Sequence, residues 1–361
     1  MKTIYIHASI HFGGGVGSVV KQLALRQLQN NDEVYLATIR DNPWAKVIAE
    51  QVGAKMLFLK DRPFKFMPKT FRGNNLKKVY DKIKRENKDA KVVMICHGVG
   101  VVGLLGKVDK KNTFVVLHGH LNKGGFVSDV FYSALFRRFK KLKYVACSNE
   151  CAVFYRNKFK IEPHVILNGC DTSGEKRSYY PEKGDLCVGM VSYLDEHKGY
   201  KYLLDAAKYI DYKKTNVRFY FVGGNADGFD FDEYAENNGL QPYLKYCGKV
   251  ADAANTIMTQ MDLVVLPSVM EGLPMALIEA LSYGIPILAT NVGGIPDILK
   301  DGYDGYFIER DGRDIAEKIE RCYDAQTYRT LSKNALALYK DCFSADVMCL
   351  NYDKFIKENS D

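Results

Sequence analysis

The sequence predicts an α/β protein built from two doubly wound, parallel-sheet domains. Its 361 residues are more than one hydrophobic core usually holds. Short apolar runs alternate with amphipathic stretches along the whole chain, which is the pattern of buried parallel strands covered by helices on both faces. A polar stretch near the middle interrupts the alternation, and we therefore expect a domain boundary there.

The first half contains candidate strands and helices in alternation. Near-continuous apolar runs predict strands at residues 4–8, 33–38, 92–96, 114–118, 144–147 and 165–167. Amphipathic periodicity predicts helices at residues 19–29, 76–87, 127–139 and 151–158. This order is typical of βαβ units, so one Rossmann-like domain is expected here.

The second half repeats the pattern, with candidate strands at residues 187–191, 218–222, 263–266 and 286–289. The expected boundaries are 1–168 for the first domain, 169–184 for a linker, 185–341 for the second domain and 342–361 for a terminal helix that crosses back to the first domain. Open α/β sheets bind ligands outside the carboxyl ends of their strands, so we expect a ligand cleft between the two domains.

Composition and cysteine usage favour a soluble, cytoplasmic protein. The chain is 47% apolar and 26% charged, as in ordinary globular proteins. The apolar run at residues 92–105 is interrupted by His97 and three glycines, so it is too short to span a bilayer, and the first residues do not resemble a leader peptide. The nine cysteines form no C-x-x-C pair, which favours reduced thiols over a metal site.

The net charge of +8 is concentrated in the first half of the chain. The basic residues there are Lys65, Lys69, Arg72, Lys77, Lys78, Lys82, Lys84, Arg85, Lys88, Arg137, Arg138, Lys140, Lys141 and Lys143. They are either solvated helix faces or a surface that attracts a phosphorylated acceptor or the inner face of a membrane. No nucleic-acid recognition module accompanies them, so nucleic acid is not an expected partner.

The segment from Asp262 to Pro286 carries the clearest chemical signal. Its pattern predicts a strand, a tight loop, a helix whose first residue is Pro274, and a helix end near Gly284. Such a helix presents free backbone N–H groups beside the carboxyl end of a strand, where they attract phosphate. Glu271 and Glu279 are eight residues apart, about 12 Å along a helix, which is too far for the paired carboxylates of a glycoside hydrolase and suits a bracket around a diphosphate.

This segment resembles the donor-site signature of the GT4-type retaining glycosyltransferases, which have the GT-B fold. The resemblance rests on the pattern P-S-x-x-E-G-L-P-x-x-x-x-E-A-x-x-x-G-x-P, which begins at Pro267. It extends to the segments Ala289–Asp297, Val165–Asp171 and Phe221–Gly224, and to the glycine-rich segment Gly13–Gly17. The resemblance implies a donor domain in the second half and an acceptor domain, more loosely matched, in the first.

The resemblance also implies roles for individual residues. In the family's pattern Glu271 contacts the transferred sugar, Glu279 binds the ribose, and Lys198 of the Lys-Gly pair neutralises the leaving diphosphate. The segment of Gly272, Leu273, Pro274 and Met275 holds the diphosphate through its backbone N–H groups, which Pro274 lacks. Gly223, in the glycine-bearing loop after another strand, is a further substrate-binding residue. Tyr193 departs from the pattern because the family usually has an arginine there, so another cation must replace it or activity must be reduced.

Residues of the first half are expected to complete the site. His118 lies at the end of the candidate strand 114–118 and is similar to the family histidine near the reacting sugar carbon, and a structural role is the alternative. His120 is a second candidate, and His97 either contacts the acceptor or packs in the core. Gly14 and Gly15 are expected to let the backbone approach the donor phosphate or the acceptor, rather than to form a dinucleotide site, because no acidic residue ends the next strand.

The implied reaction transfers a hexose or N-acetylhexosamine from a nucleotide sugar, most often a UDP-sugar in similar enzymes, to an acceptor. The acceptor is either a lipid-diphosphate-linked glycan, as in envelope or capsular polysaccharide synthesis, or a small soluble molecule. The family retains the anomeric configuration. No D-x-D-type carboxylate pair is present in a suitable loop, so no metal and no other cofactor is expected. A non-catalytic sugar-nucleotide-binding partner subunit and a GT-B epimerase are the alternatives, and donor turnover by the purified protein separates the first of these from an enzyme.

Overall fold

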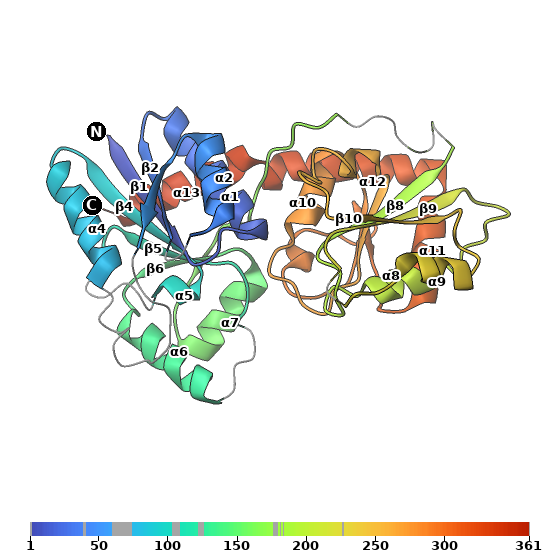
Figure 1. Ribbon diagram of the computed structural model, residues 1–361, viewed down its shortest axis with the longest axis horizontal. Coiled ribbons are helices and arrows are strands. Elements are labelled where there is room, and N and C mark those ends of the chain that lie inside the picture. Colours follow the sequence, from blue (N-terminus) through green and yellow to red (C-terminus); the bar gives the residue numbers. More distant parts are fainter. Residues whose placement is uncertain are drawn as a thin grey trace. The chain divides into compact units, whose positions relative to one another are not determined.

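The computed structural model (Figure 1) divides the chain into two compact domains. The first comprises Met1–Asn168 and Ala345–Asp361, and the second comprises Gly169–Ser344. The residues that the structure describes are 2–38, 41–59, 74–102, 109–121, 126–175, 180, 182, 184–225 and 227–360. Part of the expected linker, at residues 176–179, 181 and 183, therefore lies outside the described residues.

The first domain is a seven-stranded parallel sheet in the order β3-β2-β1-β4-β5-β6-β7. Its strands are β1 (Thr3–Ser9), β2 (Glu33–Thr38), β3 (Lys55–Phe58), β4 (Lys91–His97), β5 (Thr113–Leu117), β6 (Lys143–Ala146) and β7 (His164–Val165). Its helices are α1 (Gly14–Gln29), α2 (Pro43–Val52), α4 (Asn74–Glu86), α5 (Val99–Val102), α6 (Phe126–Arg138), α7 (Asn149–Phe159) and α13 (Ala345–Asn359).

The second domain is a six-stranded parallel sheet in the order β10-β9-β8-β11-β12-β13. Its strands are β8 (Leu186–Val191), β9 (Val217–Val222), β10 (Leu244–Gly248), β11 (Leu263–Leu266), β12 (Ile287–Ala289) and β13 (Gly305–Phe307). Its helices are α8 (Tyr200–Ala206), α9 (Phe231–Asn237), α10 (Met275–Ser282), α11 (Gly312–Cys322) and α12 (Ala325–Leu338), with short helical turns at η1 (Met258–Gln260), η2 (Ile295–Asp297) and η3 (Tyr339–Phe343).

The central strands are buried on both faces, which explains their near-continuous apolar sequence. All residues of β5 and β11 are buried, and β1 is buried from Ile4 to Ser9. The predicted fold class is therefore confirmed, and every expected strand overlaps an observed one. Strands β3, β10 and β13 were not predicted, and all three lie at a sheet edge.

Helix α13 belongs to the first domain although it follows the second domain in the chain. It packs against α1, as Figure 1 shows, through a face that includes the buried residues Met348, Cys349 and Tyr352. Its Phe355 ring contacts Phe114 of β5 with the ring centroids 5.8 Å apart. The hydrophobic core of the first domain is therefore completed by a segment that is distant in sequence.

Candidate active site

Each sheet has one point where the strand order reverses. In the second sheet the chain runs outward from β8 to β9 and β10, then returns to place β11 on the other side of β8. In the first sheet the same reversal occurs between β1 and β4. Ligands of open α/β sheets bind at the carboxyl ends of the strands at such points, so the loops after β8, β11, β1 and β4 are where a site is expected.

The loops after β8 and β11 are joined by a buried polar cluster around Glu271. The Lys198 Nζ atom lies 2.7 Å from Oε1 of Glu271, and the Ser268 hydroxyl donates a hydrogen bond to the same oxygen at 2.7 Å. Only 8% of Glu271 is exposed, so its charge needs these partners. Sequence reasoning had singled out Lys198 and Glu271 but not Ser268, whose position one residue after Pro267 at the end of the strand was the available signal.

Two glycines allow these loops to approach closely. Gly199 has φ +75°, and a Cβ atom there would lie 2.1 Å from the Pro267 carbonyl oxygen. Gly293 has φ +57°, and its Cβ would lie 2.0 Å from the carbonyl oxygen of Glu271. Both backbone conformations and both contacts exclude a side chain. The loop that carries Lys198 and the loop that carries Glu271 are thus fixed by backbone packing.

Helix α10 begins one residue later than the sequence predicts. Pro274 is the residue before the helix, with φ −71° and ψ 115°, and Met275 is the first helical residue. The extended ψ of Pro274 places Glu271 in the loop rather than on the helix, so the expectation that both carboxylates lie along one helix was wrong. Among the described residues, the backbone N–H groups of Gly272, Leu273 and Met275 have no recorded acceptor, which leaves them open to an anion.

Glu279 lies in the interior of α10 and is half-buried. Burial raises the pKa of its carboxyl to about 7, and the negative charge of Asp252 adds to this effect. No hydrogen-bond donor to the carboxyl group is recorded within the described part of the chain. Glu279 is therefore an acceptor without a partner, held near its titration point at neutral pH.

Tyr193 is 54% exposed and lies in the loop after β8, where the family pattern has arginine. A Cβ atom on Gly224 would lie 2.8 Å from Tyr193 Cε2 and 2.7 Å from Lys249 Cε, so both side chains pack against this glycine. The neighbouring Gly223 has φ +142°, and a Cβ atom there would lie 1.6 Å from the carbonyl oxygen of Ser192. Lys249 is thus a cation beside Tyr193 that sequence reasoning missed, because the strand before it, β10, was not predicted.

The glycine-rich segment of the first domain forms the start of α1. Gly14 and Gly15 are exposed, and no side chain caps this helix end. Gly14 has φ +58°, and Gly17 lies so close to Phe12 that a Cβ would be 2.1 Å from its carbonyl oxygen. The segment therefore presents backbone groups at the carboxyl end of β1.

The two candidate histidines after β5 have different surroundings. His118 is half-buried and its Nε2 lies 3.0 Å from Nδ1 of His97. The His120 ring stacks on Phe154 of α7, with the centroids 4.2 Å apart, and its Nε2 lies at ion-pair distance from Glu150 without hydrogen-bond geometry. His118 is part of a buried polar chain that continues to His7 and Gln27, two residues that were not singled out from the sequence. A histidine within the apolar strand at residues 3–9 was the available signal.

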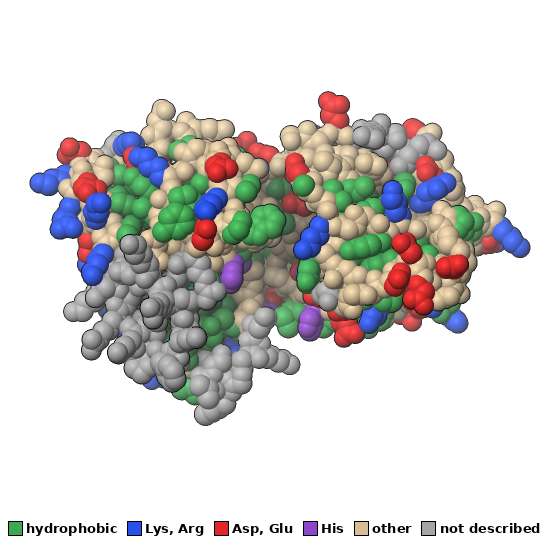
Figure 2. Space-filling view, viewed as in Figure 1, with side chains coloured by type: hydrophobic (Ala, Val, Ile, Leu, Met, Phe, Trp, Pro, Cys, Tyr) green, Lys and Arg blue, Asp and Glu red, His purple; other side chains and the backbone are tan. Residues whose placement is uncertain are grey.

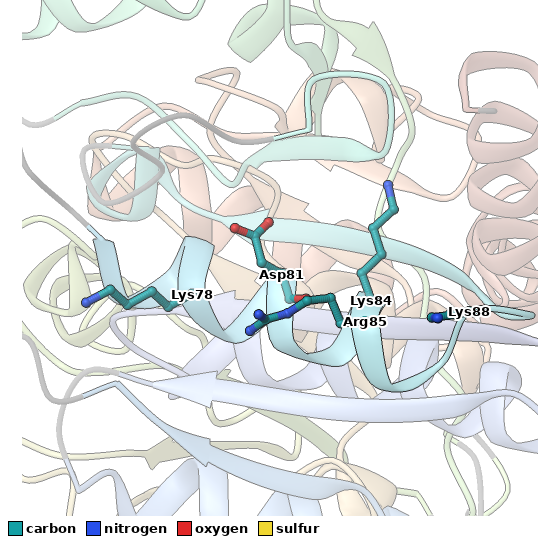
Figure 3. Close-up of a pocket in the computed structure, with 5 residues that line it drawn as sticks. All are labelled: Lys78, Asp81, Lys84, Arg85 and Lys88. Carbon is teal, nitrogen blue, oxygen red and sulfur yellow. The ribbon is translucent and has the colours of Figure 1, made fainter.

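A further cavity lies away from these residues, on α4. It has a volume of about 570 Å³ and is lined by Lys78, Asp81, Lys84, Arg85 and Lys88, which Figure 3 shows along this helix. Figure 2 shows Lys and Arg side chains on this side of the first domain. Because α4 leads into β4, the end of the helix that carries Arg85 faces the amino end of that strand. Its chemistry is that of a solvated basic surface.

The other described basic clusters also lie at the amino edge of the first sheet. Lys140, Lys141 and Lys143 come directly before or at the start of β6, and Lys110 and Lys111 precede β5. They line two adjacent cavities of about 460 and 410 Å³. His118 lies at the opposite edge, so these cations do not line the candidate site. The expected cations Lys65, Lys69 and Arg72 lie outside the described residues.

Three further findings concern the described part of the chain. It contains no group of three or more His, Cys, Asp or Glu residues placed to hold a metal ion. All nine cysteines lie within it and none forms a disulfide. No helix in it is long and apolar enough to cross a bilayer.

The site geometry agrees with the outcome of sequence comparison. The family model of glycosyl transferases group 1 matches residues 173–337, which form most of the second domain. The second domain belongs to this family. The match includes Lys198, Glu271 and Glu279, so the residues at the β8–β11 switch point lie within the group 1 domain.

Two curated relatives each match about half of the chain. An uncharacterized glycosyltransferase of Methanocaldococcus jannaschii is 30% identical over 200 residues, which are 55% of this chain and 54% of the relative. The UDP-Gal:alpha-D-GlcNAc-diphosphoundecaprenol alpha-1,3-galactosyltransferase of Escherichia coli is 32% identical over 186 residues, 47% of each chain. The chain thus spans about half the length of the curated relatives that it matches.

The likeness to a solved structure covers both the group 1 domain and the first domain. The Anabaena protein HepE, crystallised in complex with UDP, is 18% identical with a TM-score of 0.77, over 99% of this chain and all of that one. At this identity the likeness shows the fold, which is the GT-B arrangement of two Rossmann-like domains in one chain.

Proposed function

We propose that the protein is a retaining glycosyltransferase that moves a hexose or N-acetylhexosamine from a UDP-sugar to a glycan acceptor. The observation that carries the proposal is the cluster of Lys198, Glu271 and Ser268 beside the open N-terminus of α10, at the switch point of the group 1 domain. A cation and free backbone donors meet there, which is what a leaving diphosphate requires.

The chemistry of transfer explains these groups. When the bond between the anomeric carbon and the diphosphate breaks, negative charge grows on the diphosphate oxygen. Preorganised donors aimed at that oxygen stabilise the transition state, and each one removed typically costs about 100–1000-fold in kcat. Lys198 and the amides of Gly272 to Met275 supply this stabilisation in the proposal, so the reaction needs no divalent metal. Turnover that is unchanged by a chelator is the expected result.

Glu271 and Glu279 would bind the two ends of the donor. Glu271 keeps one carboxylate oxygen, Oε2, that neither Lys198 nor Ser268 occupies, and this oxygen would accept a hydrogen bond from a hydroxyl of the transferred sugar. Glu279, whose carboxyl has no recorded partner among the described residues, would accept hydrogen bonds from the ribose. His118 of the first domain would complete the sugar site, and Gly14, Gly15, Gly223 and Tyr193 would contact donor or acceptor through the loops that carry them.

The donor and acceptor classes rest on the proteins that this chain resembles. HepE was crystallised with UDP, and the E. coli relative is named for a UDP-galactose donor and a lipid-diphosphate-linked acceptor. We therefore place this protein in envelope or capsular glycan synthesis, with a lipid-diphosphate-linked glycan as acceptor. Retention of anomeric configuration, which NMR of the product would establish, completes the proposal.

The first experiment is a thermal-shift panel of UDP, GDP and their sugar conjugates. A ligand at about 100 times its dissociation constant adds about 2.7 kcal/mol to the free energy of unfolding, which is a readily measured shift. UDP compounds should stabilise the wild type, and Glu279→Ala and Lys198→Ala should lose the shift. If no nucleotide stabilises the protein, the glycosyltransferase proposal is wrong.

Tyr193 is the one observation that favours a second candidate, a sugar-nucleotide-binding subunit without catalytic activity. The loss of the family's arginine lowers the positive charge near the diphosphate. Hydrolysis or transfer from UDP-sugars by the purified protein distinguishes the two. Binding without any turnover, in the presence of lipid-diphosphate-linked acceptors, would favour the subunit.

We further propose that the amino edge of the first sheet contacts an anionic membrane surface through Lys110, Lys111, Lys140, Lys141 and Lys143. This edge is opposite to that of His118, so the contact would hold the protein at the surface and would not itself bind the acceptor. Each surface cation contributes about 1 kcal/mol to binding of anionic lipid. Cosedimentation with phosphatidylglycerol vesicles, and not with phosphatidylcholine vesicles, should be lost on changing Lys140, Lys141 and Lys143 together to glutamine.

A further inference from the structure

Four buried polar side chains of the first domain form a continuous hydrogen-bonded chain. Gln27 Oε1 lies 2.8 Å from His7 Nε2, and His7 Nδ1 lies 2.9 Å from His97 Nε2. His97 Nδ1 then lies 3.0 Å from His118 Nε2. His7, Gln27 and His97 are 0%, 3% and 3% exposed, so no water competes for these contacts. The chain ends at His118, which is half-buried.

The register of the sheet explains how three histidines meet. His7 of β1 pairs with Ile95 of β4, so His97 lies two residues further towards the carboxyl edge. His97 in turn pairs with Val116 of β5, and His118 lies two residues beyond it. A step of two residues keeps a side chain on the same face, so all three rings lie on one face of the sheet. Their stacked rings are 5.2 and 5.3 Å apart, and α1 brings Gln27 to the inner end.

Burial keeps all three rings neutral at physiological pH. It lowers the pKa of His7 and of His118 to about 4. Burial also lowers the pKa of His97 well below its ordinary value, with the two neighbouring rings adding to the effect. A neutral imidazole has one N–H group and one lone pair, so each ring donates on one side and accepts on the other.

One acceptor at the inner end therefore sets the direction of the whole chain. Gln27 Oε1 can only accept, so His7 carries its hydrogen on Nε2 and accepts at Nδ1. His97 must then donate from Nε2 to His7 and accept at Nδ1, and His118 must donate from Nε2. The Nδ1 atom of His118 is left with a lone pair, and no partner for it is recorded among the described residues.

We infer that Gln27, His7 and His97 are positioning residues that fix His118 as its Nε2–H tautomer, so that Nδ1 of His118 accepts a hydrogen bond from a substrate hydroxyl. The inference rests on the proposed function for the identity of the substrate, a sugar. It makes the site selective for a hydroxyl at one position of that sugar. A site built to accept from a hydroxyl discriminates strongly against the analogue that lacks it.

The tautomer is tested without any substrate. In the protein with ¹⁵N-labelled histidine, long-range ¹⁵N–¹H spectra distinguish a protonated ring nitrogen from an unprotonated one, and the His118 signals are assigned by their loss in His118→Gln. We expect an unprotonated Nδ1 and a protonated Nε2 at pH 7. A protonated Nδ1, or a mixture of tautomers, in the wild type would overturn the inference whatever the turnover shows.

The role of the inner residues is tested with a matched pair of variants. Gln27→Met removes the acceptor at similar volume, so both tautomers of His118 should appear, whereas Gln27→Glu retains an oxygen acceptor and should keep the Nε2–H tautomer. His164→Gln changes a histidine that does not belong to the hydrogen-bonded row of side chains. It is the control and should leave the His118 signals unchanged. An unmixed Nε2–H tautomer in folded Gln27→Met would show that Gln27 does not set the direction.

Function is read separately with a panel of monodeoxy donor sugars. For the wild type, kcat/KM with one of the deoxy donors should be about 100-fold lower than with the complete donor. This ratio should shrink to about tenfold in Gln27→Met and return to about 100-fold in Gln27→Glu. Equal discrimination in all three proteins would overturn the positioning role. If the tautomer is as expected but no nucleotide sugar is turned over, the proposed function fails while the fixed tautomer stands.

Discussion

Lys198 and Glu271 form a charge pair, 2.7 Å apart, that bridges the loops after two neighbouring strands of the second sheet. Nearly a third of the Lys198 side chain is exposed, whereas Glu271 is almost fully buried. The lysine can therefore reach a ligand without leaving its partner, and the carboxylate fixes its position. This arrangement presents a preorganised positive charge before any substrate binds.

Replacing Lys198 with methionine should lower kcat by about 100–1000-fold, because the charge on the leaving diphosphate loses its cation. The change also leaves Glu271 buried and unpaired, which lowers the free energy of unfolding by about 3 kcal/mol. The double variant Lys198→Met/Glu271→Gln should regain stability but not turnover. Lys201→Met is the control, since Lys201 pairs with Glu196 at 3.0 Å and should leave kcat within about twofold. Substantial turnover by folded Lys198→Met would contradict the role.

Nucleotide affinity should rise with pH because of Glu279. Its carboxyl has a pKa of about 7 in the folded protein, raised from 4.5, so it is mostly protonated below pH 7. Ribose hydroxyls donate to the ionised form, which means that binding below pH 7 must first remove a proton. We expect UDP to bind about tenfold more weakly at pH 6 than at pH 8 by calorimetry. Glu279→Gln should remove this dependence and Glu317→Gln, at an exposed glutamate of α11, should preserve it.

Lys249 should supply the charge that the family places at the position of Tyr193. Lys249→Met is expected to weaken UDP binding by about tenfold, or about 1.4 kcal/mol, and to weaken UMP binding less, because UMP lacks the second phosphate. Lys245→Met, at an exposed lysine of the preceding strand β10, is the control. Equal losses for UDP and UMP would place Lys249 away from the diphosphate.

Gly293→Ala adds only one methyl group but should displace the loop that carries Glu271. The new methyl group would lie 2.0 Å from the Glu271 carbonyl oxygen, and φ at this position is +57°. We expect the free energy of unfolding of the second domain to fall by about 3 kcal/mol, with loss of UDP binding. Gly239→Ala has a similar φ, +67°, but no atom within 4 Å, so it should cost only about 1–2 kcal/mol. A smaller loss at Gly293 than at Gly239 would show that the loop can move aside.

The fold was largely predictable because the period of the apolar residues is a strong signal. The central strands, such as those at residues 4–8 and 263–266, contain near-continuous apolar runs, which are typical of parallel strands buried on both faces. Edge strands lack this signal: in β3 no residue is fully buried, and Lys55 and Phe58 at its two ends are exposed. Element boundaries were less predictable, as the one-residue displacement of the α10 start at Pro274 shows.

The candidate site was predictable where it depends on local sequence. Glu271, Pro274 and Glu279 lie within nine residues, so their spacing carries information. Ser268, Lys249 and the inner residues of the histidine chain depend on which strands are neighbours. His7 and His97 are 90 positions apart, and only the register of β1 against β4 brings their rings together. No periodicity within one segment contains that information.

The place of α13 also has a consequence for the order in which the protein folds during synthesis. Helix α13 cannot cover α1 or bring Phe355 against Phe114 until Ala345–Asn359 has left the ribosome, after the whole second domain. At a translation rate of 5–20 residues per second this delay is about 10–35 s. All segments of the second domain are therefore available before the last segment of the first domain has been made. Until then the first domain has an incomplete core and is exposed to chaperones and proteases.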